Sequence, residues 1–230
     1  MNKDSNSYTL IYASVMVILV AFVLAFASEA LRPQQAKNEE IDKMRQILAA
    51  INIPSTNNNA EELYSQYIVN TYNVNALGEK TEGDPFSTEL ENELRKPEEQ
   101  RYYSVYEANI EGKTKYILSL RGAGLWGALW GFVSLNEDKD TVYGIVFGHE
   151  GETPGLGAEI SQNSFAQQFV NKRIFNRSGE FVSIAIVKPG KTAQGQDYVD
   201  GISGGTITSN GVDVMIKSSL KAYESFLIKK

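Results

Sequence analysis

Residues 200–211, DGISGGTITSNG, concentrate glycines and hydroxyl side chains immediately before an apolar helix pattern. Glycine lets a ligand approach the main chain, and the following helix offers unpaired N–H groups and the positive end of its dipole. Together these groups predict a phosphate site that needs no basic side chain. A plain glycine-rich turn capped by Ser209 or Asn210 would have the same composition. The residues expected around the phosphate are Ser203, Gly204, Gly205, Thr206 and Thr208.

A second stretch that can carry chemistry is HEGETPGLGAEI, residues 149–160. Proline fixes one backbone dihedral and glycine permits close approach, so this loop can present its backbone to a flat ring. We expect Gly155 to lie against such a ring and Leu156 to cover its face. Glu152 and Thr153 would reach the polar edge of the ring. The alternative is a Pro-Gly turn that only connects two elements.

Both tryptophans of the chain lie among glycines in RGAGLWGALWGF, residues 121–132. Glycine beside tryptophan suits a planar ligand stacked on an indole ring. We assign this stacking role to Trp126 and expect Trp130 to pack in the core.

The elements that position these stretches follow from the hydropathy pattern. Alternating segments rich in Tyr, Val and Ile predict strands, and apolar residues at helical spacing predict helices. Because the strands cluster centrally, the pattern predicts an α+β fold with a mainly antiparallel twisted sheet and flanking helices. The expected strands are 102–112, 113–122, the two segments on either side of a turn at 136–140, and 181–189; the expected helices are 39–51, 61–70, 161–172 and 212–228.

An apolar run at residues 8–27 contains no charge, glycine or proline. A helix of this length spans about 30 Å, which matches the hydrocarbon core of a bilayer. The AFA at 25–27 is similar to a signal-peptidase site, but the apolar run exceeds the usual length of about 7–15 residues in a signal peptide. We therefore favour a retained transmembrane anchor. The flanking charges do not determine which side of the membrane receives the rest of the chain.

Composition excludes several classes of function. The net charge of −6 over 230 residues argues against a nucleic-acid surface. The absence of cysteine removes disulfides, thiol nucleophiles and cysteine-ligated iron–sulfur clusters. The carboxylates Glu150, Glu152 and Glu159 lack the spacing of a defined metal site, so no metal is expected. Electron transfer would require a bound organic cofactor, which itself supplies the chemistry, so no catalytic side chain is assigned.

A hydrolase is a weaker alternative. It would use Ser203, the single histidine His149 and an acid such as Glu150. The sequence has no G-x-S-x-G motif, which argues against this arrangement.

The stretch DGISGGTITS resembles the flavinylation motif of the FMN-binding domain family, whose usual core is Ser-Gly-Ala-Thr. In that family the FMN phosphate is joined to the threonine hydroxyl, which implies a phosphoester at Thr206. Gly205 stands where alanine is commoner, a change that loosens the turn without blocking attachment. The 149–160 loop is similar to the family's His-x-Glu-Thr-Pro-Gly-Leu-Gly segment, with one extra residue after His149. The family places a Gly-Leu-Trp-Gly segment, here around Trp126, beside the flavin.

The layout of one N-terminal anchor followed by this domain resembles the C-subunit family of sodium-translocating NADH:quinone oxidoreductases. The G subunits of the Rnf ferredoxin:NAD complex share that layout and are the alternative. The resemblance implies an electron-transfer subunit of the bacterial inner membrane, with its C-terminal domain in the periplasm and activity only within the complex. Its partners would be an iron–sulfur-bearing subunit pair, a second covalent-flavin subunit and, during maturation, a flavin transferase. A membrane-anchored binding module without a cofactor is the non-enzymatic alternative.

These observations predict three parts in the chain. Residues 1–30 are expected to form the transmembrane anchor, 31–100 a helical and loop connecting region, and 101–230 the FMN-binding domain. Because the sequence has no G-x-G-x-x-G dinucleotide fingerprint, the chain by itself is not expected to oxidise NADH.

Overall fold

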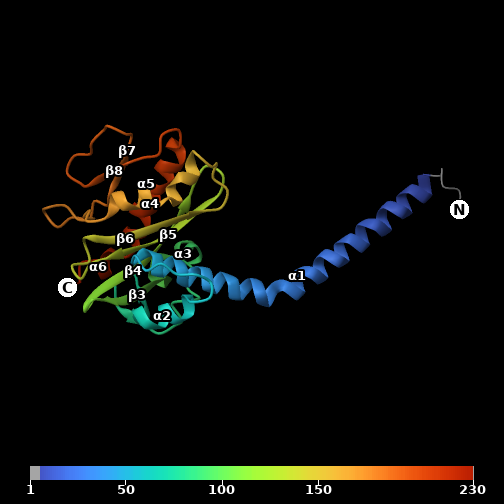
Figure 1. Ribbon diagram of the computed structural model, residues 1–230, viewed down its shortest axis with the longest axis horizontal. Coiled ribbons are helices and arrows are strands. Elements are labelled where there is room, and N and C mark those ends of the chain that lie inside the picture. The colour runs from blue at the N-terminus through green and yellow to red at the C-terminus, as the bar shows by residue number, and fades with distance from the viewer. Residues whose placement is uncertain (1–5, 230) are drawn as a thin grey trace. The chain divides into compact units, whose positions relative to one another are not determined.

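A six-stranded sheet forms the centre of the fold, with the strand order β2-β1-β3-β4-β5-β6. Figure 1 labels its strands β3 to β6. The computed structural model describes residues 6–229, so residues 1–5 of the expected anchor lie outside the described part. Each neighbouring pair in the sheet is antiparallel, which confirms the predicted fold class. The strands are β1 (Ile68–Asn75), β2 (Lys80–Thr81), β3 (Tyr102–Ile110), β4 (Lys113–Ala123), β5 (Ala128–Leu135) and β6 (Val142–His149).

The two predicted hairpins are present in the sheet. Glu111 and Gly112 connect β3 to β4 with φ angles of 52° and 80°. Left-handed conformation at both central residues is typical of two-residue hairpins, because its twist matches that of the strands. The second hairpin joins β5 to β6, and Asn136 N donates to Thr141 O at 2.9 Å to close its loop.

Side chains of the central strands alternate between two apolar clusters, because successive residues of a strand point to opposite faces of the sheet. Val105, Leu118 and Val133 belong to the first cluster. Their chain neighbours Tyr106, Ile117 and Phe132 belong to the second cluster. Both faces of the sheet are therefore covered.

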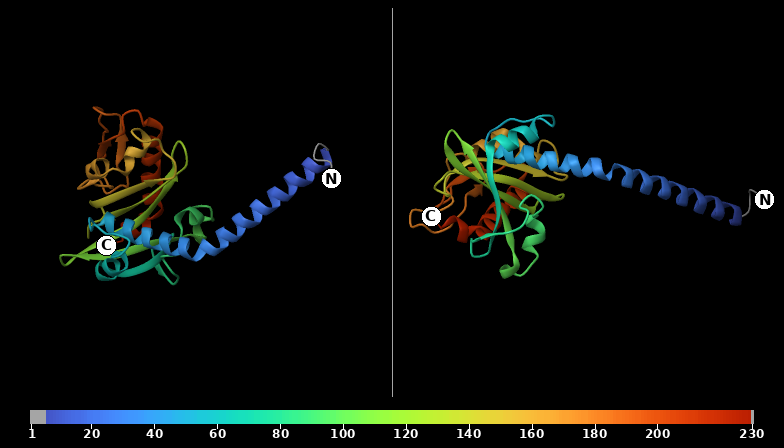
Figure 2. Two further views of the ribbon diagram at one scale, coloured as in Figure 1. Left: turned by 45° about the vertical axis from the view of Figure 1, so that its right-hand side comes forward. Right: turned by 90° about the horizontal axis from the view of Figure 1, so that it is seen from below.

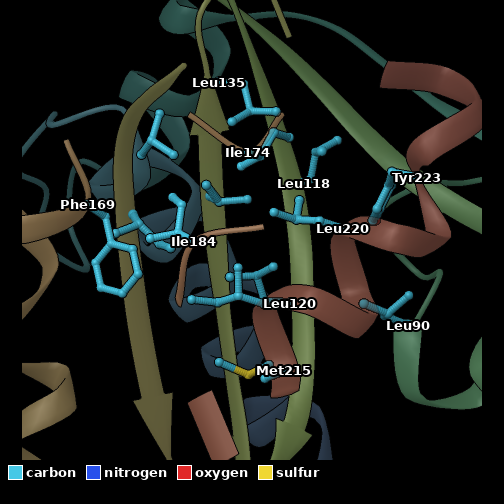
Figure 3. Packing of buried hydrophobic residues seen from close by; sticks show 14 of the residues in the cluster. Leu90, Leu118, Leu120, Leu135, Phe169, Ile174, Ile184, Met215, Leu220 and Tyr223 are labelled. Atoms are coloured by element: carbon cyan, nitrogen blue, oxygen red, sulfur yellow. The ribbon is translucent and has the colours of Figure 1, made fainter. Parts of the chain in front are cut away.

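Helix α5 (Thr206–Ala222) packs on the first face (Figures 2 and 3). Its buried apolar residues recur at helical spacing, and Met215 and Leu220 lie close to Leu118 and Leu120 of β4 in Figure 3. A Cβ on Gly211 would come within 2.4 Å of the Ala123 carbonyl oxygen, so only glycine allows this approach of helix and strand. The buried α5 residues of the first cluster are Val212, Met215, Ile216 and Leu220.

The second face is covered by the end of α1 (Asn6–Ala50) and by α2 (Ala60–Tyr67). Ile47, Leu48 and Ala50 are fully buried there. Ser134 Oγ of β5 donates to the Ala50 carbonyl oxygen at 2.5 Å, which ties the helix end to the sheet.

Several element boundaries differ from the sequence predictions. The helix expected over 61–70 ends at Tyr67, since β-branched Ile68 and Val69 enter β1. The helix expected over 161–172 is reduced to short turns, because Gln162 is extended and the Phe165 and Phe169 rings pack on Phe147. These turns are η2 (Gly157–Ser161), α4 (Asn163–Ala166) and η3 (Gln167–Phe169).

Three more boundaries differ in the C-terminal half. The strand expected over 181–189 is only β7 (Ala185–Val187), which pairs in parallel with β8 (Tyr198–Asp200), because Ser183 has a φ of 66° and interrupts it. The last helix begins at Thr206 rather than at 212, because its first turn carries polar and exposed residues that an apolar pattern does not detect. Tyr223 separates α5 from α6 (Glu224–Leu227). The remaining elements are α3 (Leu90–Leu94) and η1 (Glu98–Gln100).

Helix α1 is continuous through Pro33 and is long and apolar enough to cross a membrane. By contacts, the chain divides after Lys43 into an N-terminal unit and a compact unit that starts at Met44. Strand β1 at 68–75 pairs with β3 and so belongs to the same sheet as the strands that follow residue 101.

Candidate functional site

The N-terminus of α5 brings four hydroxyl side chains into different environments. Gly204 has a φ of 76°, and Gly205 is the N-cap, so the helix begins directly at Thr206. Thr206 and Ser203 are exposed, whereas Thr208 and Ser209 are buried within the first turn. Ser209 Oγ accepts a hydrogen bond from Ile202 N at 2.9 Å. The first turn therefore presents the Thr206 side chain to solvent, while the Ser209 hydroxyl holds the backbone at Ile202.

The 150–157 loop lies beside this helix end. A Cβ on Gly204 would come within 2.7 Å of Leu156 Cδ2, and one on Gly157 within 2.4 Å of Thr208 Oγ1. Leu156 N donates to Thr153 O at 3.1 Å, and Gly155 has a φ of 75°. This tight turn places Leu156 next to the helix start with its side chain 43% exposed.

The tip of the β4–β5 hairpin is the third segment of the site, beside the start of α5 and the 150–157 loop. Gly124 N donates to Gly127 O at 2.8 Å, and the turn between them leaves Trp126 66% exposed. Trp130 faces Gly148 across the β5–β6 pair and is partly buried, as a packing residue. The structure thus separates the two tryptophans into one exposed ring and one packed ring.

A single buried carboxylate joins these three segments. Glu152 is 5% exposed, and its Oε2 accepts from Thr208 Oγ1 at 2.6 Å. Its Oε1 accepts from Trp126 N at 2.9 Å. Glu152 N donates to His149 Nδ1 at 3.2 Å. The side chain is thus directed into the protein, and of the two residues expected at the polar edge of a ring, Glu152 is buried and Thr153 is exposed.

The electrostatic state of Glu152 follows from these contacts. Burial of the carboxyl raises its pKa, but hydrogen bonds from the Thr208 hydroxyl and from the backbone N–H groups of Trp126 and Leu125 outweigh burial. The pKa of Glu152 therefore lies below its ordinary value, and the group is ionised at neutral pH.

A pocket of about 250 Å³ lies beside Thr206 between α5, the 201–204 turn and the residues after β7. It contains one basic side chain, Lys188, which sequence reasoning missed. The signal available was the Lys188-Pro189-Gly190 end of an apolar strand, but only the fold brings it to the helix start. The other lining residues are Ile186, Val187, Pro189, Gly201, Ile202, Ser203, Gly204, Thr206, Ser209 and Asn210.

Exposed apolar side chains surround the same helix start. Trp126 and Leu156 are joined by Leu125 (47% exposed) and Ile207 (58% exposed), which come from the hairpin tip and the first turn of α5. Exposed apolar side chains that gather in one region of a surface are a feature of binding sites. Within residues 6–229, no cluster of metal-binding side chains is found.

The hydrolase arrangement gains no support from this geometry. His149 Nδ1 accepts the amide of Glu152 in its own loop, and Glu150 Oε2 accepts from Ala128 N. These groups hold the loop.

The chain resembles known proteins over nearly its whole length. Residues 124–221 match the FMN-binding domain family. The C subunit of the Na(+)-translocating NADH-quinone reductase of Haemophilus ducreyi is 34% identical over 94% of this chain and 90% of its own length. The same subunit from Pseudomonas aeruginosa is 30% identical over 94% of this chain and 91% of its own. The crystal structure of the C subunit from Parabacteroides distasonis is 52% identical, with a TM-score of 0.83 over 87% of this chain and 98% of that one.

The family match therefore defines residues 124–221 as an FMN-binding domain, in a chain that also has an apolar N-terminal helix. The chain belongs to the C-subunit family of the Na(+)-translocating NADH-quinone reductases, which are oxidoreductase complexes. The predicted family is confirmed in preference to the Rnf alternative.

Proposed function

We propose that this chain carries FMN as a phosphoester on Thr206 and transfers electrons within a sodium-translocating NADH:quinone reductase. The observation that supports the attachment point is the contrast among the hydroxyls. Thr206 is exposed on the first turn of α5, while Thr208 and Ser209 are buried and hydrogen-bonded. In the attachment step Thr206 Oγ1 would attack the phosphorus of the FMN half of a flavin dinucleotide, the donor used by the transferase. The new P–O bond replaces the bond to the departing nucleoside monophosphate, and the hydroxyl proton is released. The chain thereby gains the mass of FMN less one water.

The residues present fit both ends of FMN. The pocket beside Thr206 offers the start of α5, the backbone at Ser203 and Gly204 and the ammonium group of Lys188 to the phosphate. The exposed rings and methyl groups of Trp126, Leu156 and Ile207 offer an apolar surface to the isoalloxazine. Thr153 and Gly155 lie on the exposed side of the loop that carries Leu156. The proposed site therefore includes every exposed member of the predicted one.

Bound FMN supplies the capacity to take up and release electrons, and the protein's part is to hold and orient it. A tether also keeps a cofactor in a compartment where no free pool replaces it, because linkage sets a high effective concentration. The electrons would arrive from an iron–sulfur-bearing pair of membrane subunits and leave to a second covalent flavin on the way to ubiquinone. Sodium transport would belong to the assembled complex.

The same proposal includes a location. Helix α1 anchors the chain in the bacterial inner membrane by a single span, with the flavin domain on the periplasmic side. A cysteine introduced at the exposed Ser178, in a chain without native cysteine, would be labelled in intact cells by a membrane-impermeant maleimide if this orientation is correct. Labelling only after the inner membrane is permeabilised would contradict it.

The decisive experiment is intact mass and in-gel flavin fluorescence of the purified chain, expressed with a flavin transferase. Thr206→Val is expected to fold and to lose both the added mass and the fluorescent band. Ser203→Ala, which removes the other exposed hydroxyl of the turn, is the matched control and is expected to retain both. A modified Thr206→Val chain would place the ester elsewhere, and an unmodified wild-type chain would leave only an anchored binding module.

A further inference from the structure

The glutamate of the 150–157 loop is buried beneath the surface that would receive the flavin, and its contacts differ from those of a ligand-binding group. Its two carboxylate oxygens are each taken by a protein donor, Thr208 Oγ1 at 2.6 Å and Trp126 N at 2.9 Å. The side chain is 5% exposed, and Thr208 is 2% exposed. Glu152 therefore acts on a bound ligand through its neighbours.

Those neighbours are adjacent in sequence to the groups that face the ligand. Trp126 donates its backbone N–H to Glu152 and carries the exposed indole ring. Thr208 lies two residues after Thr206 in the same helical turn. Leu156 lies four residues after Glu152 in the same loop. The Glu152 carboxylate is thus hydrogen-bonded to the hairpin tip, which carries the indole ring of Trp126, and to the first turn of α5, which carries the Thr206 hydroxyl. Glu152 itself belongs to the loop that carries Leu156.

Glycines make room for this carboxylate on two sides. A Cβ on Gly124 would come within 2.3 Å of Glu152 Oε1, and a Cβ on Gly157 within 2.4 Å of Oε2. These two glycines belong to the hairpin tip and to the loop itself. Both positions require glycine, since any larger residue would displace the Glu152 carboxylate.

We propose that Glu152 is the positioning residue of the flavin site, a buried anionic link that sets the spacing of Trp126, Leu156 and Thr206 before the cofactor arrives. This inference rests on the proposed function for the identity of the ligand, while the link itself is a property of the chain without flavin. Holding site groups in place by a second layer of hydrogen bonds is the general means of preorganising a site. The link requires an ionised carboxylate, because both oxygens must act as acceptors.

The first arm of the test uses chains without flavin, in a Thr206→Val background, and measures hydrogen–deuterium exchange of the peptide that contains Trp126. Glu152→Ala is expected to raise the exchange rate there by about tenfold or more, the ratio that corresponds to one lost hydrogen bond to a charged acceptor. Thr208→Val is expected to raise it less, because the Trp126 bond remains. Glu62→Gln is the control: it removes one carboxylate charge at an exposed position on α2, away from the hairpin tip, and leaves exchange at Trp126 unchanged.

The second arm uses the flavin-bearing chain and compares flavin emission before and after denaturation. A ring stacked on Trp126 is quenched in the native protein, so Glu152→Ala is expected to recover much of the emission at equal flavin content. Thr208→Ser keeps the hydroxyl and is expected to show the wild-type quenching of flavin emission. Thr208→Val lacks the hydroxyl and is expected to show weaker quenching. If Glu152→Ala does not fold, Glu152→Gln and Thr208→Val carry both arms, because each removes one acceptor or donor at constant size.

The outcomes separate the two proposals. Wild-type exchange at Trp126 in the Glu152 variants would overturn the positioning role whatever the flavin content. Equal native quenching in wild type and Glu152→Ala, at equal flavin content, would overturn it as well. A wild-type chain without FMN, combined with increased exchange in Glu152→Ala, would overturn the proposed function and leave the link standing.

Discussion

The second face of the sheet and the site at the start of α5 distribute polarity in opposite ways. On the second face, Ile47, Leu48, Ile117 and Phe132 are buried against one another. At the site, apolar Trp126, Leu156 and Ile207 are exposed while the carboxylate of Glu152 is buried.

This difference separates a surface that stabilises the fold from the one proposed to receive the flavin. Burial of apolar side chains is the main favourable term in folding, and a buried charge costs free energy unless it is fully hydrogen-bonded. An exposed apolar side chain next to a buried, fully hydrogen-bonded charge contributes little to the free energy of folding. Its presence therefore indicates a role in function. Substitutions in the two regions should therefore have separable effects on stability and on flavin binding.

The largest expected effect on stability comes from the second face. Leu48 is fully buried where α1 meets the sheet, so Leu48→Ala is expected to lower the free energy of unfolding by about 2–5 kcal/mol. The flavin content of the folded chain should stay at the wild-type level. Urea unfolding followed by circular dichroism measures the free energy of unfolding, and flavin absorbance of the folded fraction measures the flavin content. The control Leu77→Ala, at a side chain 65% exposed, should change neither by a measurable amount.

A smaller effect on stability is expected from Gly157→Ala. The added methyl group would come within 2.4 Å of Glu152 Oε2 and Thr208 Oγ1, so the link between loop and helix must shift, at a cost of about 1–3 kcal/mol. Here the flavin content is expected to fall together with the free energy of unfolding. Gly151→Ala in the same loop adds a methyl group whose nearest neighbour lies at 3.7 Å, and should be neutral. Equal free energies of unfolding and equal flavin contents in Gly157→Ala and Gly151→Ala would contradict the close packing of Gly157 against Glu152 and Thr208.

Acidification should weaken the site in a way that the apolar face does not share. The pKa of Glu152 is lowered in the folded chain, chiefly by hydrogen bonds that outweigh the effect of burial. Its stabilising contribution is therefore fully present above the ordinary carboxyl pKa of about 4.3 and is lost as the pH falls through the folded-state pKa. The dependence of the free energy of unfolding on pH below about 4 should be shallower in Glu152→Gln than in wild type. Parallel curves would show that Glu152 does not contribute.

The smallest effect is expected at Lys188, an exposed residue in the pocket beside Thr206. Lys188→Gln removes a charge that is screened by solvent, so the free energy of unfolding should change by less than about 0.5 kcal/mol. Flavinylation should become slower and less sensitive to salt, since the phosphate loses its one cationic neighbour in the pocket and with it the attraction that salt screens. Time courses of flavin incorporation at two salt concentrations measure this. Lys191→Gln, in the same loop outside the pocket, is the control.

The sequence by itself determined the elements whose signals are local. The hairpin at Glu111–Gly112 follows from alternating strands around a turn residue pair, and the span at 8–27 follows from an unbroken apolar run. The attachment candidate Thr206 and the exposed Trp126 were also predictable, because a short glycine-rich motif is recognised from a few neighbouring residues alone. Boundaries were less predictable where polar residues begin an element, as at the first turn of α5.

Only the tertiary structure decided which site residues face a ligand and which face one another. Glu152 and Thr208 are 56 positions apart, and nothing local shows that their side chains meet in the interior. The same holds for Lys188, which reaches the pocket through the pairing of β7 with β8. The physical reason is that a buried carboxylate is stable only where donors from distant segments converge on it, and convergence is a property of the folded chain.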